Sequence, residues 1–235
     1  MSHHSTSEEQ FEEIKEFLAK SWKIIAVIVI IGLLSIWGWR YWKSYQHDKS
    51  LEASDRYEQL IAKLDTNNPQ SVDELVSFAK DTNTVYSVFA NMKAAQFYVE
   101  TLKDYAGAKD LLTAAAKETD SAPILAIINI RIARLQVQLG EYEESLKTLA
   151  KVKEESWTPV VDDIKADVFV KLERFADAVD AYEVALMAKP TPELEKNIKM
   201  KLNQAQYLKA KQELEQAKLE AEKEKAQQQP QESAQ

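Results

Sequence analysis

The clearest hydrophobic pattern in the chain is a run of sixteen consecutive uncharged residues, from Ile24 to Trp39. Ten of these residues are Ile, Leu or Val, and together they favour insertion into a lipid bilayer by roughly 3–6 kcal/mol. Aromatic residues and the basic residues Lys23 and Arg40 flank the run, as is typical of a membrane surface. A helix over residues 22–42 would be about 31 Å long, which is enough to cross the hydrocarbon layer.

We therefore expect an uncleaved transmembrane anchor at residues 22–42. The anchor residues are Trp22, Ile24, Ile25, Val27, Ile28, Ile31, Leu34, Trp37, Trp39 and Trp42. A buried helix of a soluble core is one alternative, but the aromatic residues at both ends of the run argue against it. A cleaved signal peptide is another, but the preceding segment is partly acidic and no small-residue cleavage site follows. Basic residues are nearly balanced on the two sides, so charge alone does not predict the orientation.

Helical periodicity continues after the anchor, at Leu51, Tyr57, Leu60, Ile61 and Leu64. It stops at Asn67-Asn68-Pro69, a sequence typical of a turn. We interpret residues 43–68 as an amphipathic connecting helix. Ser71 then begins a capping-box pattern that predicts the start of another helix ending near Lys80.

Three later stretches resemble one another: residues 105–108 (YAGA), 142–145 (YEES) and 175–178 (FADA). Their final small residues are 37 and 33 positions apart. A helix–turn–helix unit of about 34 residues is typical of tetratricopeptide (TPR) repeats. The small residues allow paired helices to approach closely and the aromatic residues fill the space between pairs. The expected packing residues are Tyr105, Ala108, Ala133, Tyr142, Ser145, Ala166, Phe169, Phe175, Ala178, Tyr182, Ala185 and Pro190.

The repeats depart from the TPR pattern at three positions, one of which is Lys165, where Leu is usual. The early Trp is absent from all three units, and the turn Gly occurs only as Gly140, with Lys103 and Glu173 at the equivalent positions. A generic stack of helical hairpins is therefore the alternative, and both readings predict an all-α solenoid after the anchor. We expect a TPR-like domain at 69–209 and an N-terminal segment at 1–21. We expect a charged tail at 210–235, in which a frayed helix gives way to disorder.

A solenoid offers a concave surface formed by the first helix of each pair. The residues expected to line this groove are Lys93, Phe97, Glu100, Ile130, Arg134, Val137, Asp163, Asp167 and Val170. This mixture of charged and apolar side chains suits a segment of another protein.

The composition restricts the chemistry. With no Cys, four Gly and three His, the chain has no thiolate metal site, no clustered-glycine phosphate loop and little basis for a His-centred catalytic site. The net charge of −8 disfavours nucleic acid as a partner. We expect no cofactor, no metal and no catalytic residue. An enzyme that uses its surface carboxylates is the alternative from another functional class.

The chain resembles a known family in three short sequence segments. It also shares the family's order of acidic N-terminus, anchor and degenerate repeats. The three segments are Gly38–Trp42 (GWRYW), Asn129–Leu139 (NIRIARLQVQL) and the region around Trp157. Over about residues 8–205 the chain resembles the YfgM family, the ancillary subunit of the bacterial SecYEG translocon.

The resemblance implies a single-pass protein of the bacterial inner membrane, with residues 1–21 in the cytoplasm and the repeat domain in the periplasm. It implies association with the SecYEG translocon and with PpiD, a membrane-anchored periplasmic chaperone, and assistance to secreted client proteins. A link to envelope-stress signalling is implied for some members. A scaffold for another envelope process, such as cell division, is the alternative.

Overall fold

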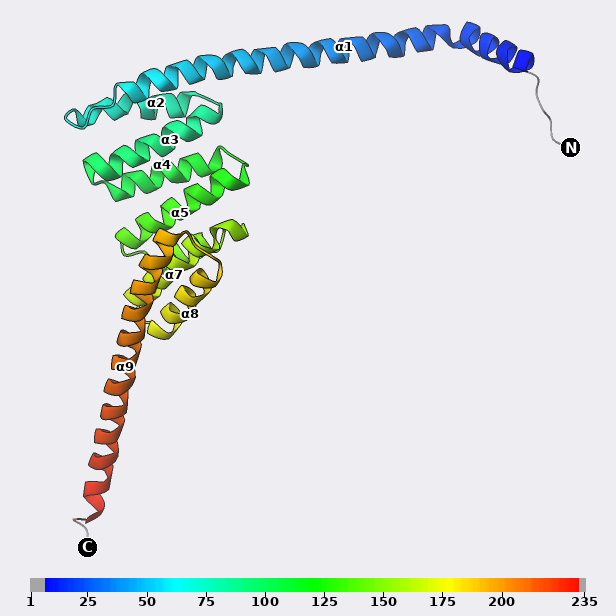
Figure 1. Cartoon of the computed structure of the whole chain (residues 1–235). Coiled ribbons are helices and arrows are strands. Elements are labelled where there is room, and N and C mark those ends of the chain that lie inside the picture. The colour runs from blue at the N-terminus through cyan, green and yellow to red at the C-terminus, as the bar shows by residue number, and fades with distance from the viewer. Residues whose placement is uncertain (1–6, 233–235) are drawn as a thin grey trace, which may run out of the picture. The chain divides into compact units, whose positions relative to one another are not determined.

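A computed structural model describes residues 7–232 of the chain. Within that range the regular secondary structure is helical and there is no strand. One isolated β-bridge joins Asp65 and Asn68. The helices are α1 (Ser7–Ala62), α2 (Asp73–Asp81), α3 (Val85–Phe97), α4 (Tyr105–Lys117), α5 (Ala122–Gln138), α6 (Tyr142–Leu149), α7 (Thr158–Lys171), α8 (Phe175–Met187) and α9 (Pro192–Glu232) (Figure 1). Three single turns, η1 (Pro69–Val72), η2 (Tyr98–Leu102) and η3 (Glu155–Trp157), connect them. The predicted all-α fold is confirmed.

The chain separates into two compact units between Arg56 and Tyr57. In the first unit, α1 is one continuous helix that contains the apolar run. The stretch Ala19–Ala62 includes a window of mean hydropathy 2.0, long and apolar enough to cross a membrane. The described anchor side chains are exposed, from 55% at Val27 to 71% at Trp37, whereas the side chain of Ile25 lies outside the described residues. Exposure of large apolar side chains on this scale suits lipid rather than water.

The second unit is a stack of antiparallel helical hairpins (Figure 1). Consecutive helices pack against each other, and each layer between them has its own apolar cluster. The four clusters centre on Leu75 (last turn of α1, α2 and α3), Ile128 (α3, α4 and α5), Leu149 (α5, α6 and α7) and Tyr182 (α7, α8 and α9). This arrangement is that of a solenoid, in which each unit contacts only its neighbours.

Three hairpin turns share one backbone conformation, a residue with a positive φ angle. Lys103, Gly140 and Glu173 each follow the first helix of a pair, and each has a positive φ, of 56°, 76° and 58°. After Gly140 and Glu173 the chain closes a Schellman motif, because the next amide donates to a carbonyl five residues back (Glu141 to Gln136, 2.8 Å; Arg174 to Phe169, 2.9 Å). The two non-glycine residues therefore adopt the turn geometry that the repeat pattern assigns to glycine.

Two local predictions differ from the structure. Ser71 does not cap a helix: its hydroxyl accepts from the amide of Asp65 at 3.0 Å and holds the preceding bend, and α2 begins two residues later. Beyond Lys209, where a frayed helix giving way to disorder was expected, α9 continues as helix to Glu232. Its Ala, Glu, Lys, Gln and Leu residues have high helix propensity, which favours that continuation. Residues 1–6 and 233–235 lie outside the described range, and the division of the chain into five segments remains a prediction.

Candidate functional site

The small residues at the predicted packing positions are buried. Ala108, Ala133, Ser145, Ala166, Ala178 and Ala185 are each 0% exposed, and Tyr182 is 2% exposed. The aromatic residues Tyr105, Tyr142, Phe169 and Phe175 and the terminal Pro190 are partly buried. The buried hydroxyl of Ser145 donates a hydrogen bond to the carbonyl of Ala133 at 3.0 Å, across the α5–α6 pair. Sites without space for a larger side chain hold the helix pairs in register and so shape the concave face.

A cavity of about 820 Å³ opens on the faces of α3, α5 and α7. Five of the predicted groove residues line it: Glu100, Arg134, Val137, Asp163 and Asp167. The apolar part of its wall includes Met92, Val99 and Leu135. The cavity is therefore lined by both apolar and charged side chains.

The remaining four predicted groove residues do not line this cavity. Phe97 and Ile130 are 6% and 4% exposed and belong to the apolar clusters between hairpins, so their assignment to the groove is corrected. Val170 packs against the cluster around Tyr182. Lys93 is half-buried and donates to Gln96 at 3.1 Å on its own helix. The apolar residues were misassigned because a helix inside a solenoid is covered by neighbouring helices on two sides. Most apolar positions of α3 and α5 therefore face those helices and not the groove.

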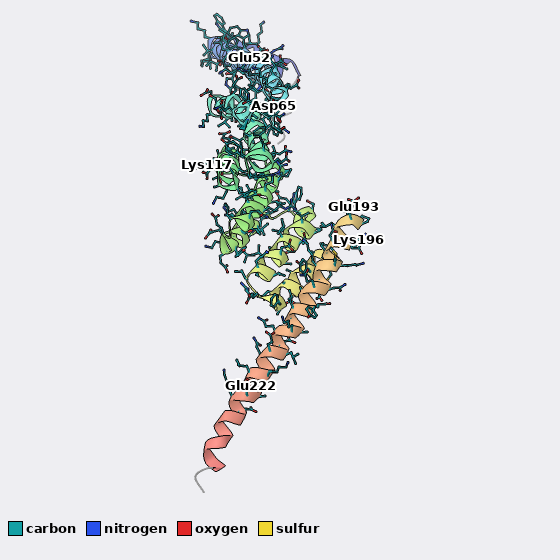
Figure 2. The ribbon with its side chains drawn as sticks, turned by 90° about the vertical axis from the view of Figure 1, so that its left-hand side faces the viewer. Glu52, Asp65, Lys117, Glu193, Lys196 and Glu222 are labelled. Carbon is teal, nitrogen blue, oxygen red and sulfur yellow. The ribbon has the colours of Figure 1, made fainter. Side chains whose placement is uncertain are left out.

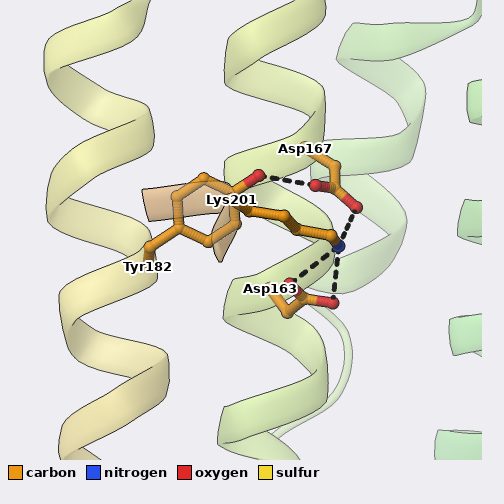
Figure 3. Close-up of polar contacts among 4 residues, drawn as sticks. All are labelled: Asp163, Asp167, Tyr182 and Lys201. Carbon is orange, nitrogen blue, oxygen red and sulfur yellow. Dashed lines mark hydrogen bonds and ion pairs between the residues drawn. The ribbon is translucent and has the colours of Figure 1, made fainter. Parts of the chain in front are cut away.

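Three of the charged lining residues, Asp163, Asp167 and Lys201, belong to one cluster of polar contacts with Tyr182 (Figure 3). Lys201 of α9 reaches α7, where its Nζ donates to both carboxylate oxygens of Asp163 (2.9 and 3.2 Å) and to Oδ2 of Asp167 (2.7 Å). Tyr182 of α8 donates its hydroxyl to Oδ1 of Asp167 at 2.6 Å. The cluster thus joins three consecutive helices through side chains that are mostly removed from water.

The ionisation of these groups follows from two carboxylates sharing one ammonium. Burial raises the pKa of Asp163, and its contacts with Lys201 offset this only in part, because Asp167 is also nearby. Burial lowers the pKa of Lys201, but its two carboxylate partners outweigh that effect and the net pKa is raised. Burial and the hydrogen bond to Asp167 raise the pKa of Tyr182. At neutral pH the ammonium is therefore charged and the tyrosine neutral.

Two charged residues of the cavity lining, Lys201 and Arg131, were absent from the predicted groove. Lys201 lies between Ile198 and Leu202, in the apolar stripe by which α9 packs against α8. A lysine in such a stripe indicates that a carboxylate partner is buried nearby. Arg131 is exposed on α5 and lies one turn before Arg134, so the cavity lining carries two guanidinium groups from the same helix. No periodicity rule distinguishes Arg131 from an ordinary solvent-facing residue.

The arrangement resembles a binding surface more than a reaction centre. Among the described residues there is no group of three or more His, Cys, Asp or Glu side chains able to hold a metal ion. Asp163 and Asp167 are both engaged by Lys201. What the fold and the cavity define is a helical-repeat protein with an N-terminal helix able to cross a membrane and a cavity lined by apolar and charged side chains.

Comparison with known proteins gives a more specific class. Residues 15–207 match the family described as "Tetratricopeptide repeat-like domain", which confirms the predicted likeness to TPR repeats. Three relatives carry the name "Ancillary SecYEG translocon subunit". The chain is 32% identical to that of Escherichia coli over 86% of its own length and 98% of the relative. It is 27% identical to that of Haemophilus influenzae (86% and 99%) and 28% identical to that of Aggregatibacter actinomycetemcomitans (72% and 82%).

The chain therefore belongs to the family of ancillary SecYEG translocon subunits, as the resemblance over residues 8–205 predicted. The match includes the apolar part of α1 as well as the solenoid. The part of α9 after residue 207 lies beyond the match.

Proposed function

We propose that this chain is a non-enzymatic scaffold, tethered to a bacterial inner membrane by α1, that works beside the Sec translocon. The observation that carries the proposal is the 32% identity that spans 98% of a relative named as an ancillary SecYEG translocon subunit. The membrane-spanning length of the apolar part of α1 supports the tether. Residues 1–21 are proposed to lie in the cytoplasm and the solenoid in the periplasm.

The concave cavity is the proposed site of protein binding. Its apolar wall provides burial for a partner side chain, and its charged residues provide orientation. Arg131 and Arg134 favour a carboxylate of the partner in the cavity, since guanidinium groups bind carboxylates through paired hydrogen bonds. The proposed partners are the translocon itself, a membrane-anchored periplasmic chaperone of the PpiD type, and secreted proteins as they leave the channel.

Site-specific photo-crosslinking tests the proposal. A photoreactive residue is placed at Gln96, Arg134 or Gln138, which line the cavity, and at Glu144 or Glu183 as controls on α6 and α8. Irradiation of intact cells is expected to give crosslinks to a translocon subunit or a periplasmic chaperone from the cavity positions, and weaker ones from the controls. Crosslinks only to components of another envelope assembly, such as the division machinery, would overturn the assignment.

The proposed topology has a separate test. Because the chain has no Cys, single cysteines at Ser5 and Glu144 can be labelled with a membrane-impermeant maleimide in spheroplasts. Labelling is expected at Glu144→Cys and not at Ser5→Cys until the membrane is permeabilised. The reverse pattern would place the solenoid in the cytoplasm and exclude a periplasmic role.

A further inference from the structure

The last helix carries two different faces. The face of α9 toward the solenoid holds Leu194, Ile198, Leu202 and Ala205, which pack in the cluster around Tyr182. Further along that face, the side-chain amide of Gln212 donates to the carbonyl of Glu173 at 3.3 Å. The helix then continues to Glu232, past the end of the hairpin stack, and Glu222 lies on this extension (Figure 2).

The opposite face of α9 has an exposed apolar stripe. Its members alternate at spacings of three and four residues, the heptad pattern of coiled coils. They are Tyr207, Ala210, Leu214, Ala217 and Ala221, all exposed, with Met200 one heptad earlier. Met200, Tyr207 and Leu214 are 66%, 68% and 56% exposed. In the same register Ile198, Ala205 and Gln212 fall at the position farthest from the stripe, so a partner helix on the stripe leaves the solenoid contacts intact.

Charged residues border the stripe with opposite signs on its two edges. Lys211 and Lys218 follow the second apolar position of each heptad, and Glu213 and Glu220 precede the first. In a parallel pair of such helices, Glu213 of one copy faces Lys218 of the other, and the reciprocal pair forms at the same time. In an antiparallel pair the edges meet like with like, Glu against Glu and Lys against Lys, which is destabilising.

We propose that the α9 extension forms a parallel two-stranded coiled coil with the same stripe of a second copy of this chain. The charge pattern favours a second copy of the same helix and a parallel direction. Only in a parallel homodimer does the acidic edge of each helix lie against the basic edge of the other. Most of the stripe, from Ala210 to Ala221, lies outside the family match at residues 15–207, and the contact does not involve the cavity to which the translocon function is assigned above.

The stripe is rich in alanine, which buries little apolar area, so the isolated helix is expected to pair weakly. Anchoring both copies in one bilayer compensates for this. It gives the two chains the same orientation and raises their concentration relative to each other. The dimer is therefore expected to form in a membrane and to dissociate readily in dilute detergent.

Disulfide crosslinking of the full chain in liposomes tests the proposal, since the natural chain has no Cys. Four single variants are compared after mild oxidation: Tyr207→Cys and Ala221→Cys on the stripe, and Glu215→Cys and Leu219→Cys on other faces of the same helix. Both stripe variants are expected to yield covalent dimers at least fivefold above the two controls. An antiparallel pair would crosslink Tyr207→Cys with Ala221→Cys in a mixture but neither variant with itself.

Charge exchange provides the second measurement. The double variants Glu213→Lys/Glu220→Lys and Lys211→Glu/Lys218→Glu are each combined with Ala221→Cys. Each is expected to lose most of its crosslinking alone and to regain it when the two are mixed. Equal crosslinking at stripe and control positions, or indifference to charge exchange, would overturn the proposal. Either result would leave the translocon assignment untouched, because that assignment rests on the identity to the named relative and is tested at the cavity.

Discussion

At the residue scale, the hairpin turns show that a backbone conformation can be retained where the residue that prefers it is lost. Gly140 reaches φ 76° at no steric cost, whereas Lys103 and Glu173 hold φ 56° and 58° with a Cβ present. The side chain of Glu173 is exposed, and its backbone carbonyl makes the contact with Gln212. The strain at this position is therefore removable without loss of a contact.

Replacing Glu173 by Gly is expected to raise the free energy of unfolding by about 0.5–1 kcal/mol, because the left-handed conformation no longer strains a Cβ. The matched control is Gly140→Ala, which introduces that strain and is expected to lower the free energy of unfolding by about 1 kcal/mol. Urea unfolding of the detergent-solubilised chain, followed by circular dichroism, measures both. A destabilised Glu173→Gly variant would contradict this account of the turn.

The sequence predicted these turns correctly but misplaced some of the groove. The register of small residues located the hairpins, because Ala108, Ser145 and Ala178 occupy sites with no space for a larger side chain. Phe97 and Ile130 were assigned to the groove because periodicity identifies an apolar face but not which neighbour covers it. Lys201 was missed because its partners, Asp163 and Asp167, lie 38 and 34 residues away in the chain.

At the element scale, α9 is held to the solenoid both by apolar packing and by the ammonium of Lys201. The side chain of Asp163 is only 10% exposed and that of Asp167 is 39% exposed. Removing the ammonium leaves both carboxylates without their counter-ion, in surroundings that already raise the pKa of Asp163. The polar part of the attachment of α9 to α7 therefore depends on this one side chain.

The variant Lys201→Met is expected to lower the free energy of unfolding by about 2–3 kcal/mol, at or just below the lower end of the range for breaking a buried ion pair, because Asp167 is partly solvated. Its unfolding midpoint is also expected to recover partly on acidification, as the orphaned carboxylates become protonated. Lys199→Met is the matched control: Lys199 pairs with Glu195 on the exposed side of α9, at 61% and 43% exposure. A surface pair of this kind contributes at most about 0.5 kcal/mol.

At the scale of the whole molecule, the chain combines a helix suited to lipid, a solenoid with a concave cavity and a helical extension beyond the family match. The helix suited to lipid could be predicted from the run of apolar residues in the sequence. The extension was expected to fray and give way to disorder, because its sequence has few apolar residues. Helix propensity, together with continuity from the docked part of α9, favours the helix that the structure describes.

Deleting residues 213–235 separates the contributions of the solenoid and the extension. The truncated chain keeps Gln212 and all of the cluster around Tyr182, so its free energy of unfolding is expected to change by less than about 0.5 kcal/mol. Crosslinking through Tyr207→Cys is expected to fall severalfold, because most of the stripe is absent. A loss of more than about 1 kcal/mol would instead indicate that the extension packs on its own solenoid.

The position of α9 also limits how this protein can lengthen in evolution. By covering α8, it occupies the surface on which another hairpin would have to be added. A duplicated unit must therefore be inserted before α9, in the interior of the stack. Relatives with extra repeats should carry them in the interior, with their last hairpin still closed by the counterpart of α9.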